Sequence, residues 1–427
     1  MTNRARESYQ VRSCVAPTKP HPKEADIKKS GFWSFFSGLL PLFVVAHFGH
    51  HLLTALLVPL LPFIRDEFAL DYAQAGWVVA AFSLSYGIAQ LPAGWLADRI
   101  GSRTLVTVGI SGVAVSGLLV GVSTTHITMI AFLVLLGITG GGYHPASVSL
   151  ISTVVEPKNW GRALGIHQIG GTGSYFLAPL IAVGIAAAVG WRGAFIGLAI
   201  PILVFGIVFN VLLGRQGRSK KGDDGIPRSQ FEPPIHRARL ARLVPLLTLS
   251  IAGNVLVFST LSFIPLFVVD HFGGSEQAGA ALLALAYSAG FWAAPLGGYL
   301  SDRLGTLVVL LLASLVIGPI LYLLNVASYG WGISAVLLAL GVSLYLRMPT
   351  TEAYIVGQTS ERNRSTILGI YHFGAAEGAG VVTPTIGYLI DRFGFSTSFT
   401  IVGASMMAIA LGCGLFLWRS RNQPSLQ

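Results

Sequence analysis

The segment Gly94-Trp-Leu-Ala-Asp98-Arg99-Ile-Gly101 occurs again, in similar form, as Gly298-Tyr-Leu-Ser-Asp302-Arg303-Leu-Gly305. In both copies an Asp-Arg pair stands between two glycines at the same spacing, and the copies are 204 positions apart, 298 against 94. The same offset relates Pro145 to Pro349 and Gly190 to Gly394. Several matches at one offset indicate two copies of one structural unit.

The sequence around both copies is strongly apolar. Hydrophobic residues make up 53% of the chain and charged residues only 11%, whereas a soluble domain has roughly 25% charged residues. A helix of about 20 apolar residues crosses the hydrocarbon core, and a β-barrel would show short alternating strands instead. We therefore predict an all-α polytopic membrane protein with twelve transmembrane helices in two six-helix halves. The predicted spans lie near 37–64, 72–96, 104–122, 127–153, 163–188, 194–213, 243–269, 278–300, 306–325, 331–355, 365–390 and 396–418.

The basic residues predict the orientation of these spans. If both termini are cytoplasmic, all of the 28 Lys and Arg residues except Arg65, Arg192, Arg347 and Arg392 fall in cytoplasmic segments, as the positive-inside rule requires. We expect a multi-pass protein of the cell inner membrane, and the net charge of +10 then implies no nucleic-acid partner. The predicted parts are a tail at 1–36, halves at 37–213 and 243–419, a linker at 214–242 that can touch anionic lipid, and a tail at 420–427.

The repeated segment falls in the short turn between the second and third spans of each half. Asp98 and Asp302 can accept hydrogen bonds or pair with a neighbouring arginine where the halves meet, and the glycines allow close helix approach. A solvated turn would explain one copy, but two copies at matching positions favour a cytoplasmic gate. The predicted gate residues are Gly94, Asp98, Arg99, Gly101, Arg103, Gly298, Asp302, Arg303 and Gly305.

With these motifs the chain resembles the major facilitator superfamily over about residues 35–420. The first copy matches that family's loop motif, with Ser102 where a basic residue is common, and the second copy is weaker because Thr306 and Leu307 stand at basic positions. The run Gly140-Gly-Gly-Tyr143-His144-Pro145-Ala146 is similar to the branch of fosmidomycin-resistance exporters. The resemblance implies alternating access around a cavity lined by the first, fourth, seventh and tenth spans.

A further segment, Gly173-Ser-Tyr-Phe-Leu-Ala178-Pro179, is similar to the glycine-proline motif of proton-coupled drug antiporters. Ala178 stands where that motif has its key glycine. Small residues followed by proline can also simply pack and bend a membrane helix. Both interpretations remain open at this point.

Three charged residues fall inside predicted spans: Arg347, Glu352 and Glu377. Charge in hydrocarbon costs several kcal/mol, so these residues are functional candidates. Arg347 and Glu352 diverge by about 140° around one helix, so they are not expected to pair. Arg347 can hold an anionic substrate group or a carboxylate elsewhere, and Glu352 can exchange protons, with Glu377 as its rival. A structural ion pair bridging helices is the alternative for each.

Histidines follow one face of the first span, at positions 47, 50 and 51. Neither an acidic cluster nor further ligands accompany them in sequence, so we expect hydrogen-bonding or proton-accepting imidazoles and no metal site. His144 is favoured among the other histidines because it adjoins Pro145 on a lining span. The candidate substrate or proton site comprises Glu352, Arg347, Glu377, His144, His47, His50, His51, Tyr143, Asn254 and His372.

The combined features predict a secondary active transporter that moves a small organic molecule by alternating access, in proton-coupled export. Uptake or exchange of a small organic anion, with Arg347 as its anchor, is the alternative. A transport-inactive membrane sensor is a second alternative, against which the intact first gate motif and the intramembrane charges argue. No phosphate-binding loop or nucleophile motif is present, so we expect no ATP coupling, cofactor or enzyme activity. The expected partners are the substrate, protons and the bilayer, with a monomer as the working unit.

Overall fold

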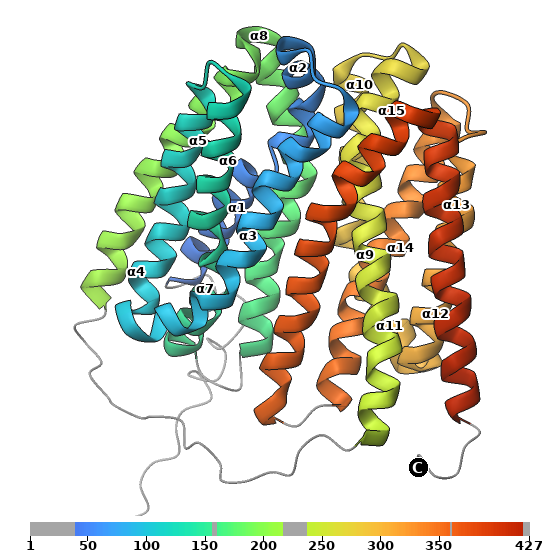
Figure 1. Cartoon of the computed structure of the whole chain (residues 1–427). Coiled ribbons are helices and arrows are strands. Elements are labelled where there is room, and N and C mark those ends of the chain that lie inside the picture. The colour runs from blue at the N-terminus through green and yellow to red at the C-terminus, as the bar shows by residue number, and fades with distance from the viewer. Residues whose placement is uncertain (1–38, 156–159, 217–236, 359–360, 422–427) are drawn as a thin grey trace, which may run out of the picture.

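The computed structural model describes residues 39–155, 160–216, 237–358 and 361–421. Every regular element in these ranges is a helix, and the long helices run side by side as one bundle (Figure 1). The predicted tails at 1–36 and 420–427 fall outside these ranges, except that the last helix continues to Arg421. The predicted linker 214–242 is shorter than expected, because helices extend to Gln216 and restart at Arg237. Its residues 217–236 lie outside the described part.

The first half contains the elements up to Gln216. They are α1 Leu40–Thr54, α2 Leu57–Phe68, α3 Tyr72–Ile100, α4 Ser102–Thr107, a π-helical turn Val108–Gly112, α5 Val113–Gly121, α6 His126–Gly141, α7 Tyr143–Val154 and α8 Trp160–Gln216.

The second half contains the elements from Arg237 onward. They are α9 Arg237–Phe272, α10 Glu276–Ser288, a 3-10 turn Ala289–Phe291, α11 Ala293–Leu304, α12 Thr306–Leu315, α13 Ile317–Leu323, α14 Trp331–Gln358 and α15 Glu361–Arg421.

Two of these helices turn back on themselves at a glycine. Gly190 in α8 has φ 78° and ψ 165°, and Gly394 in α15 has φ 74° and ψ 171°, a region that glycine enters without a Cβ clash. By length and hydropathy, nine helical segments in the described ranges are able to span a membrane. Two of these nine contain the glycine turns and therefore cross twice, and α3 adds one more crossing. The prediction of twelve spans is thereby confirmed.

The two halves repeat the same backbone geometry at the offset seen in the sequence. Gly101 has φ 86° and ψ 138°, and Gly305, 204 positions later, has φ 87° and ψ 137°. The turns at Gly190 and Gly394 form a second matching pair. In Figure 1 the elements up to α8 and those from α9 onward form two neighbouring groups of helices. The pseudo-symmetric halves expected from the repeat are therefore present.

The halves meet along a seam between α3 and α15, where small residues allow the backbones to approach. A Cβ on Gly76 would lie 2.6 Å from the Cα of Pro384. A Cβ on Gly387 would collide with the carbonyl oxygen of Tyr72. Because side chains are missing at these contacts, the two helices pack backbone to backbone.

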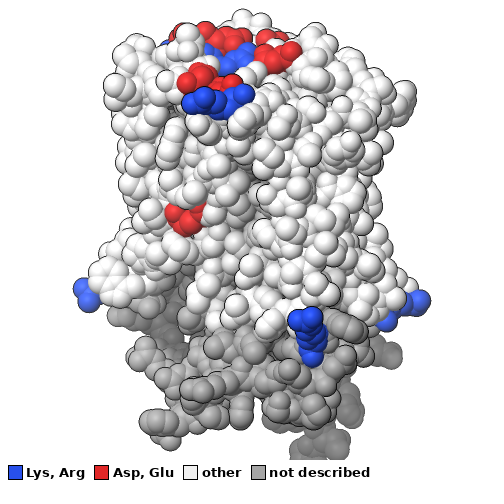
Figure 2. Space-filling view, turned by 45° about the vertical axis from the view of Figure 1, so that its right-hand side comes forward, with Lys and Arg blue, Asp and Glu red and all other residues white. Residues whose placement is uncertain are grey.

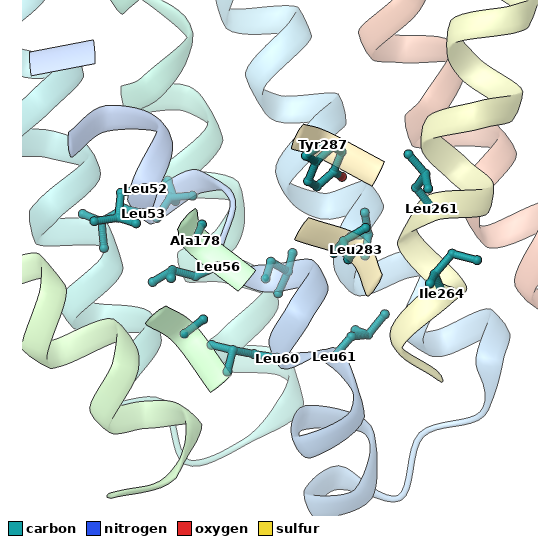
Figure 3. Packing of buried hydrophobic residues seen from close by; sticks show 14 of the residues in the cluster. Leu52, Leu53, Leu56, Leu60, Leu61, Ala178, Leu261, Ile264, Leu283 and Tyr287 are labelled. Carbon is teal, nitrogen blue, oxygen red and sulfur yellow. The ribbon is translucent and has the colours of Figure 1, made fainter. Parts of the chain in front are cut away.

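Apolar packing continues across the boundary between the halves. Leu56 and Leu61 of the first half belong to the same buried cluster as Leu261 and Leu283 of the second half (Figure 3). All four residues are completely buried. This apolar contact adds van der Waals packing across the boundary between the halves.

The outer surface separates into a charged end and an apolar band. Figure 2 shows acidic and basic groups gathered together at the top of the bundle, basic groups toward its lower end, and an otherwise uncharged middle with one acidic patch. Large side chains such as Trp77 and Leu415 are more than half exposed in the band. A surface this apolar is suited to lipid contact, which agrees with a multi-pass membrane protein.

Candidate functional site

A cluster of imidazole and phenol rings is buried in the first half. His47, His50 and His51 extend from α1 and meet Tyr143 and His144 at the start of α7, together with His167 of α8. The side chains of His47, His50 and Tyr143 are completely buried. The structure therefore brings together the three-histidine face predicted from the sequence and the favoured His144.

Glycines make room for these rings. A Cβ on Gly109 would lie 2.8 Å from the Cβ of Tyr143, and one on Gly141 would lie 2.7 Å from the carbonyl oxygen of Tyr86. A Cβ on Gly171 would lie 2.6 Å from the ring of His47. Glycines in the π-helical turn, in α6 and in α8 thus let the helices approach closely enough to enclose the cluster.

Hydrogen bonds to carbonyl oxygens fix two of the histidine tautomers. Nδ1 of His47 donates to the carbonyl oxygen of His167 at 2.8 Å, and Nδ1 of His50 donates to that of Gly109 at 2.9 Å. Since a carbonyl can only accept, each Nδ1 carries the proton. Nε2 of His50 lies 3.4 Å from the hydroxyl of Tyr86, whereas the buried Nε2 of His47 has no hydrogen-bond partner.

His51 and His144 face each other across the boundary between α1 and α7. Their Nε2 atoms are 3.0 Å apart, so one must carry a proton and the other a lone pair. Nδ1 of His51 lies 3.4 Å from the hydroxyl of Thr54. One nitrogen from each of His47, His51 and His144 lies within 4.8 Å of the others.

The second half contains a buried cation. Arg347 of α14 is 1% exposed, and its Nη2 donates to the carbonyl oxygen of Ser250 in α9 at 2.7 Å. Nε and Nη1 of Arg347 are buried and have no hydrogen-bond partner. The guanidinium lies flat against Gly253, where any Cβ would collide with it. Among the described carboxylates none forms an ion pair with Arg347.

Further polar side chains surround Arg347. Nδ2 of Asn254 donates to the hydroxyl of Tyr371 at 2.8 Å, and Oδ1 of Asn254 has no partner. The hydroxyls of Ser250 and Thr351 are 3.0 Å apart. This second cluster therefore joins α9, α14 and α15, as the first joins α1, α7 and α8.

The two clusters occupy equivalent positions in the two halves. Adding the repeat offset of 204 to 50, 143 and 167 gives 254, 347 and 371, so His50, Tyr143 and His167 correspond to Asn254, Arg347 and Tyr371. Sequence reasoning left His167 and Tyr371 out of the site. The same offset, applied also to the polar residues of the fifth and eleventh spans, would have found both.

Glu352 has a partner in the neighbouring helix. Its Oε1 lies 3.7 Å from Nε2 of His372, and the two side chains are 43% and 49% exposed. Glu352 and Arg347 take different partners, as their angular separation on α14 suggests.

Oε1 of Glu377 is buried without a partner, directly against Gly87 of α3. Glu377 therefore belongs to the seam between the halves.

The arginines of the repeated turn mostly contact their own half. The guanidinium of Arg99 stacks over Trp95 at 4.3 Å, and that of Arg303 stacks over Tyr299 at 4.8 Å. Arg103 donates to the side chain and carbonyl of Asn210 at 2.9 and 2.7 Å. The surroundings of Gly94, Asp98 and Asp302 lie outside the described part. The predicted gate therefore stays a prediction.

At the opposite end of the bundle, a polar latch that was not predicted joins the halves. Arg65 of α2 forms a two-contact ion pair with Asp270 of α9, one contact being 3.0 Å. The hydroxyl of Tyr72 also donates to Asp270 at 2.7 Å. Asp391 of α15 accepts from the backbone N–H groups of Tyr72 and Ala73 at 3.0 and 2.8 Å. We call this group of four side chains the latch.

The latch closes one end of the boundary between the halves. The repeat offset gave a signal for it, because Asp270 corresponds to Asp66, the neighbour of Arg65, so charged residues stand at equivalent positions in the two halves. Opposite charges at equivalent ends of the first and seventh spans can meet across the pseudo-symmetry axis. The positive-inside pattern predicts that this end faces outward.

A surface groove lies elsewhere in the first half. It is an open groove of about 460 Å³ between α3 and α6, lined by apolar residues such as Trp77, Leu84 and Ile130 together with Ser85. None of the buried charged or histidine residues lines this groove. Its chemistry suits an acyl chain of the bilayer better than a polar substrate.

Comparison with known families agrees with this architecture. The profile of the Major Facilitator Superfamily matches residues 43–347 and 295–427. The chain belongs to this superfamily. Among solved structures, a POT family transporter in complex with 5-aminolevulinic acid superposes with a TM-score of 0.77, at 13% identity, over 89% of this chain and 96% of the other. This likeness concerns the fold alone.

Relatives of this superfamily member carry names of small-molecule transporters. The probable sulfoacetate transporter of Cupriavidus necator is 27% identical, covering 83% of this chain and 87% of the relative. The hexuronate transporter of Bacillus subtilis is 22% identical over 80% and 85% of the two chains. The fosmidomycin resistance protein of Escherichia coli is 21% identical over 83% and 87%, which agrees with the resemblance to that branch.

Proposed function

We propose that this transporter carries small organic anions, and that Arg347 binds their negative group. The observation that carries the proposal is the guanidinium of Arg347, which is 1% exposed, has two nitrogens without a hydrogen-bond partner and pairs with no described carboxylate. A buried arginine keeps its charge, and leaving that charge unpaired is costly. An anionic ligand removes this cost when it binds.

The surroundings of Arg347 add selectivity. Oδ1 of Asn254 is a free acceptor close to the hydroxyl of Tyr371, so donors on the substrate also find partners. Carboxylates and sulfonates offer the acceptor oxygens that guanidinium groups prefer. Two relatives are named for sulfoacetate and hexuronate, which supports this substrate class. Anion uptake or exchange is therefore favoured over export of neutral drug-like molecules.

We predict that purified protein in proteoliposomes exchanges an organic anion far better than its uncharged counterpart. The measurement is counterflow of labelled sulfoacetate and of a hexuronate, beside the parent hexose as the matched neutral compound. Each anion is first tested alone, and mixed competition then shows whether one site takes both. Equal exchange of hexuronate and hexose would contradict the proposal.

A second proposal concerns coupling to protons, which the sequence analysis expected in export and which we propose here for anion uptake. The carboxylate of Glu352 lies 3.7 Å from His372 of α15, and both side chains are half-exposed. Glu352 stands five residues beyond Arg347 on α14. We infer that Glu352 takes up the coupling proton. A substrate anion and a proton then move together, which reduces the net charge crossing the membrane.

We predict that Glu352→Gln abolishes uphill accumulation driven by a pH gradient but retains downhill exchange, because glutamine imitates the protonated carboxyl group. Accumulation and counterflow are measured in the same vesicle preparation. Glu377→Gln is the matched variant, since that carboxyl group lies in the seam against Gly87. If Glu377→Gln loses accumulation while Glu352→Gln keeps it, the coupling role belongs to Glu377.

A further inference from the structure

We infer that His47, His51 and His144 form a binding site for a divalent transition-metal ion in the first half. One nitrogen from each imidazole lies within 4.8 Å of the other two. In a tetrahedral zinc site with Zn–N bonds of about 2.0–2.1 Å, ligand nitrogens are about 3.4 Å apart. The 3.0 Å separation of His51 and His144 is already near this value. The nitrogen of His47, within 4.8 Å of both, would move closer when the ion binds.

The outer hydrogen bonds have the pattern that metal-binding histidines show. A ligating imidazole usually donates its second nitrogen to a carbonyl or hydroxyl group, which fixes the tautomer. Nδ1 of His47 donates to the carbonyl oxygen of His167 at 2.8 Å, so its Nε2 has a lone pair. That Nε2 is buried and has no partner. An unsatisfied buried acceptor is costly, and a cation would satisfy it.

His51 is able to switch tautomers without losing a partner. Its Nδ1 lies 3.4 Å from the hydroxyl of Thr54, which can donate or accept. When an ion binds Nε2, the proton of His51 resides on Nδ1 and faces this hydroxyl. Three neutral imidazoles without a thiolate favour Zn²⁺, Ni²⁺ or Co²⁺ over Mg²⁺ or Ca²⁺. A fourth position stays open for water or another ligand.

The sequence predicted no metal site because it did not show a further ligand near the histidines of the first span. His144 is 93 residues away from His51 in the chain and joins it only through the packing of α7 on α1. The nearby His50 is not available as a ligand, since its Nδ1 binds Gly109 and its Nε2 approaches Tyr86. The ion would therefore link α1 to α7 through three side chains.

The test uses the full chain in detergent, titrated with Co²⁺ and with Zn²⁺. We expect one saturable site with the visible absorption of tetrahedral Co²⁺, displaced by Zn²⁺, and a rise in melting temperature on binding. His51→Gln and His144→Gln should each weaken binding by about 100-fold or more, beyond the 10- to 100-fold usual for a lost outer partner.

Control variants separate this site from surface binding and from misfolding. His271→Gln on α9, whose ring stacks on Phe267, removes an imidazole outside the cluster and should leave Co²⁺ absorption unchanged. Thr54→Val keeps all three ligands and should weaken binding about 10-fold. Identical titration curves for the unaltered protein and the His51→Gln/His144→Gln double variant, with both folded, would overturn the inference. Because the readout is metal binding, failure of the anion proposal does not affect it.

Discussion

Arg347→Gln is expected to abolish saturable anion exchange while the protein still inserts and folds. Truncating one side of a buried, hydrogen-bonded charge pair costs about 2–5 kcal/mol, which corresponds to a loss of affinity of about 30-fold or more. Arg347→Lys keeps the charge but loses the planar donor arrangement, so we expect an intermediate loss. The measurement is anion binding by calorimetry together with counterflow.

An apolar replacement of Arg347 should not destabilise the unliganded protein. Nε and Nη1 of Arg347 make no hydrogen bonds in the structure. An apolar side chain of similar size removes a costly unpaired charge and gives up only the hydrogen bond from Nη2 to Ser250. Arg347→Met is therefore expected to keep or raise the melting temperature in detergent. A structural role for Arg347 predicts the reverse, a clear loss of stability together with the loss of transport.

Arg392→Gln is the matched control in the same half. Its guanidinium stacks over Tyr388 at 5.7 Å near the turn at Gly394. The variant therefore removes one positive charge from α15 at a position distant from the cluster around Arg347. Anion affinity should remain within a factor of about two. If Arg392→Gln reduces binding as strongly as Arg347→Gln, the effect comes from overall charge and Arg347 is not the anion anchor.

The number of helices could be predicted because each crossing needs its own apolar stretch, and the turns between crossings are marked by glycine and charge. The turn at Gly190 illustrates this, since the equivalent Gly394 adopts the same left-handed conformation. Helix ends were less predictable. α9 begins at Arg237, several residues before the predicted span at 243, because a helix continues past the hydrocarbon where hydropathy gives no signal.

The polar contacts between spans were predictable only in part. The stacking of Arg99 on Trp95 and of Arg303 on Tyr299 connects residues four apart, a spacing that helix geometry brings together. The meeting of His51 with His144 depends instead on how α1 and α7 are rotated about their axes. Sequence periodicity identifies the face of each helix but leaves that relative rotation undetermined.

Asp270→Asn is expected to weaken the latch and shift the protein toward the state in which this end is open. Asp270 holds both Arg65 and the hydroxyl of Tyr72, so one substitution removes an ion pair and weakens a charged hydrogen bond between the halves. The side chains of Arg65 and Asp270 are 15% and 23% exposed, so the pair lies between surface and fully buried cases. We expect a shift of about 1–3 kcal/mol, or 5- to 150-fold in the ratio of states.

Spin labels at Thr124 and Ser328, both exposed loop positions of different halves, report this change as a longer inter-label distance. Asp66→Asn is the matched control, because Asp66 also binds Arg65 at 2.8 Å but lies beside it in the same half. Gly387→Ala should also lengthen the distance between the labels, but for a steric reason. The added methyl group collides with the Tyr72 carbonyl oxygen across the seam. If Asp66→Asn opens this end as far as Asp270→Asn does, the ion pair between Arg65 and Asp270 is not what holds the two halves together there.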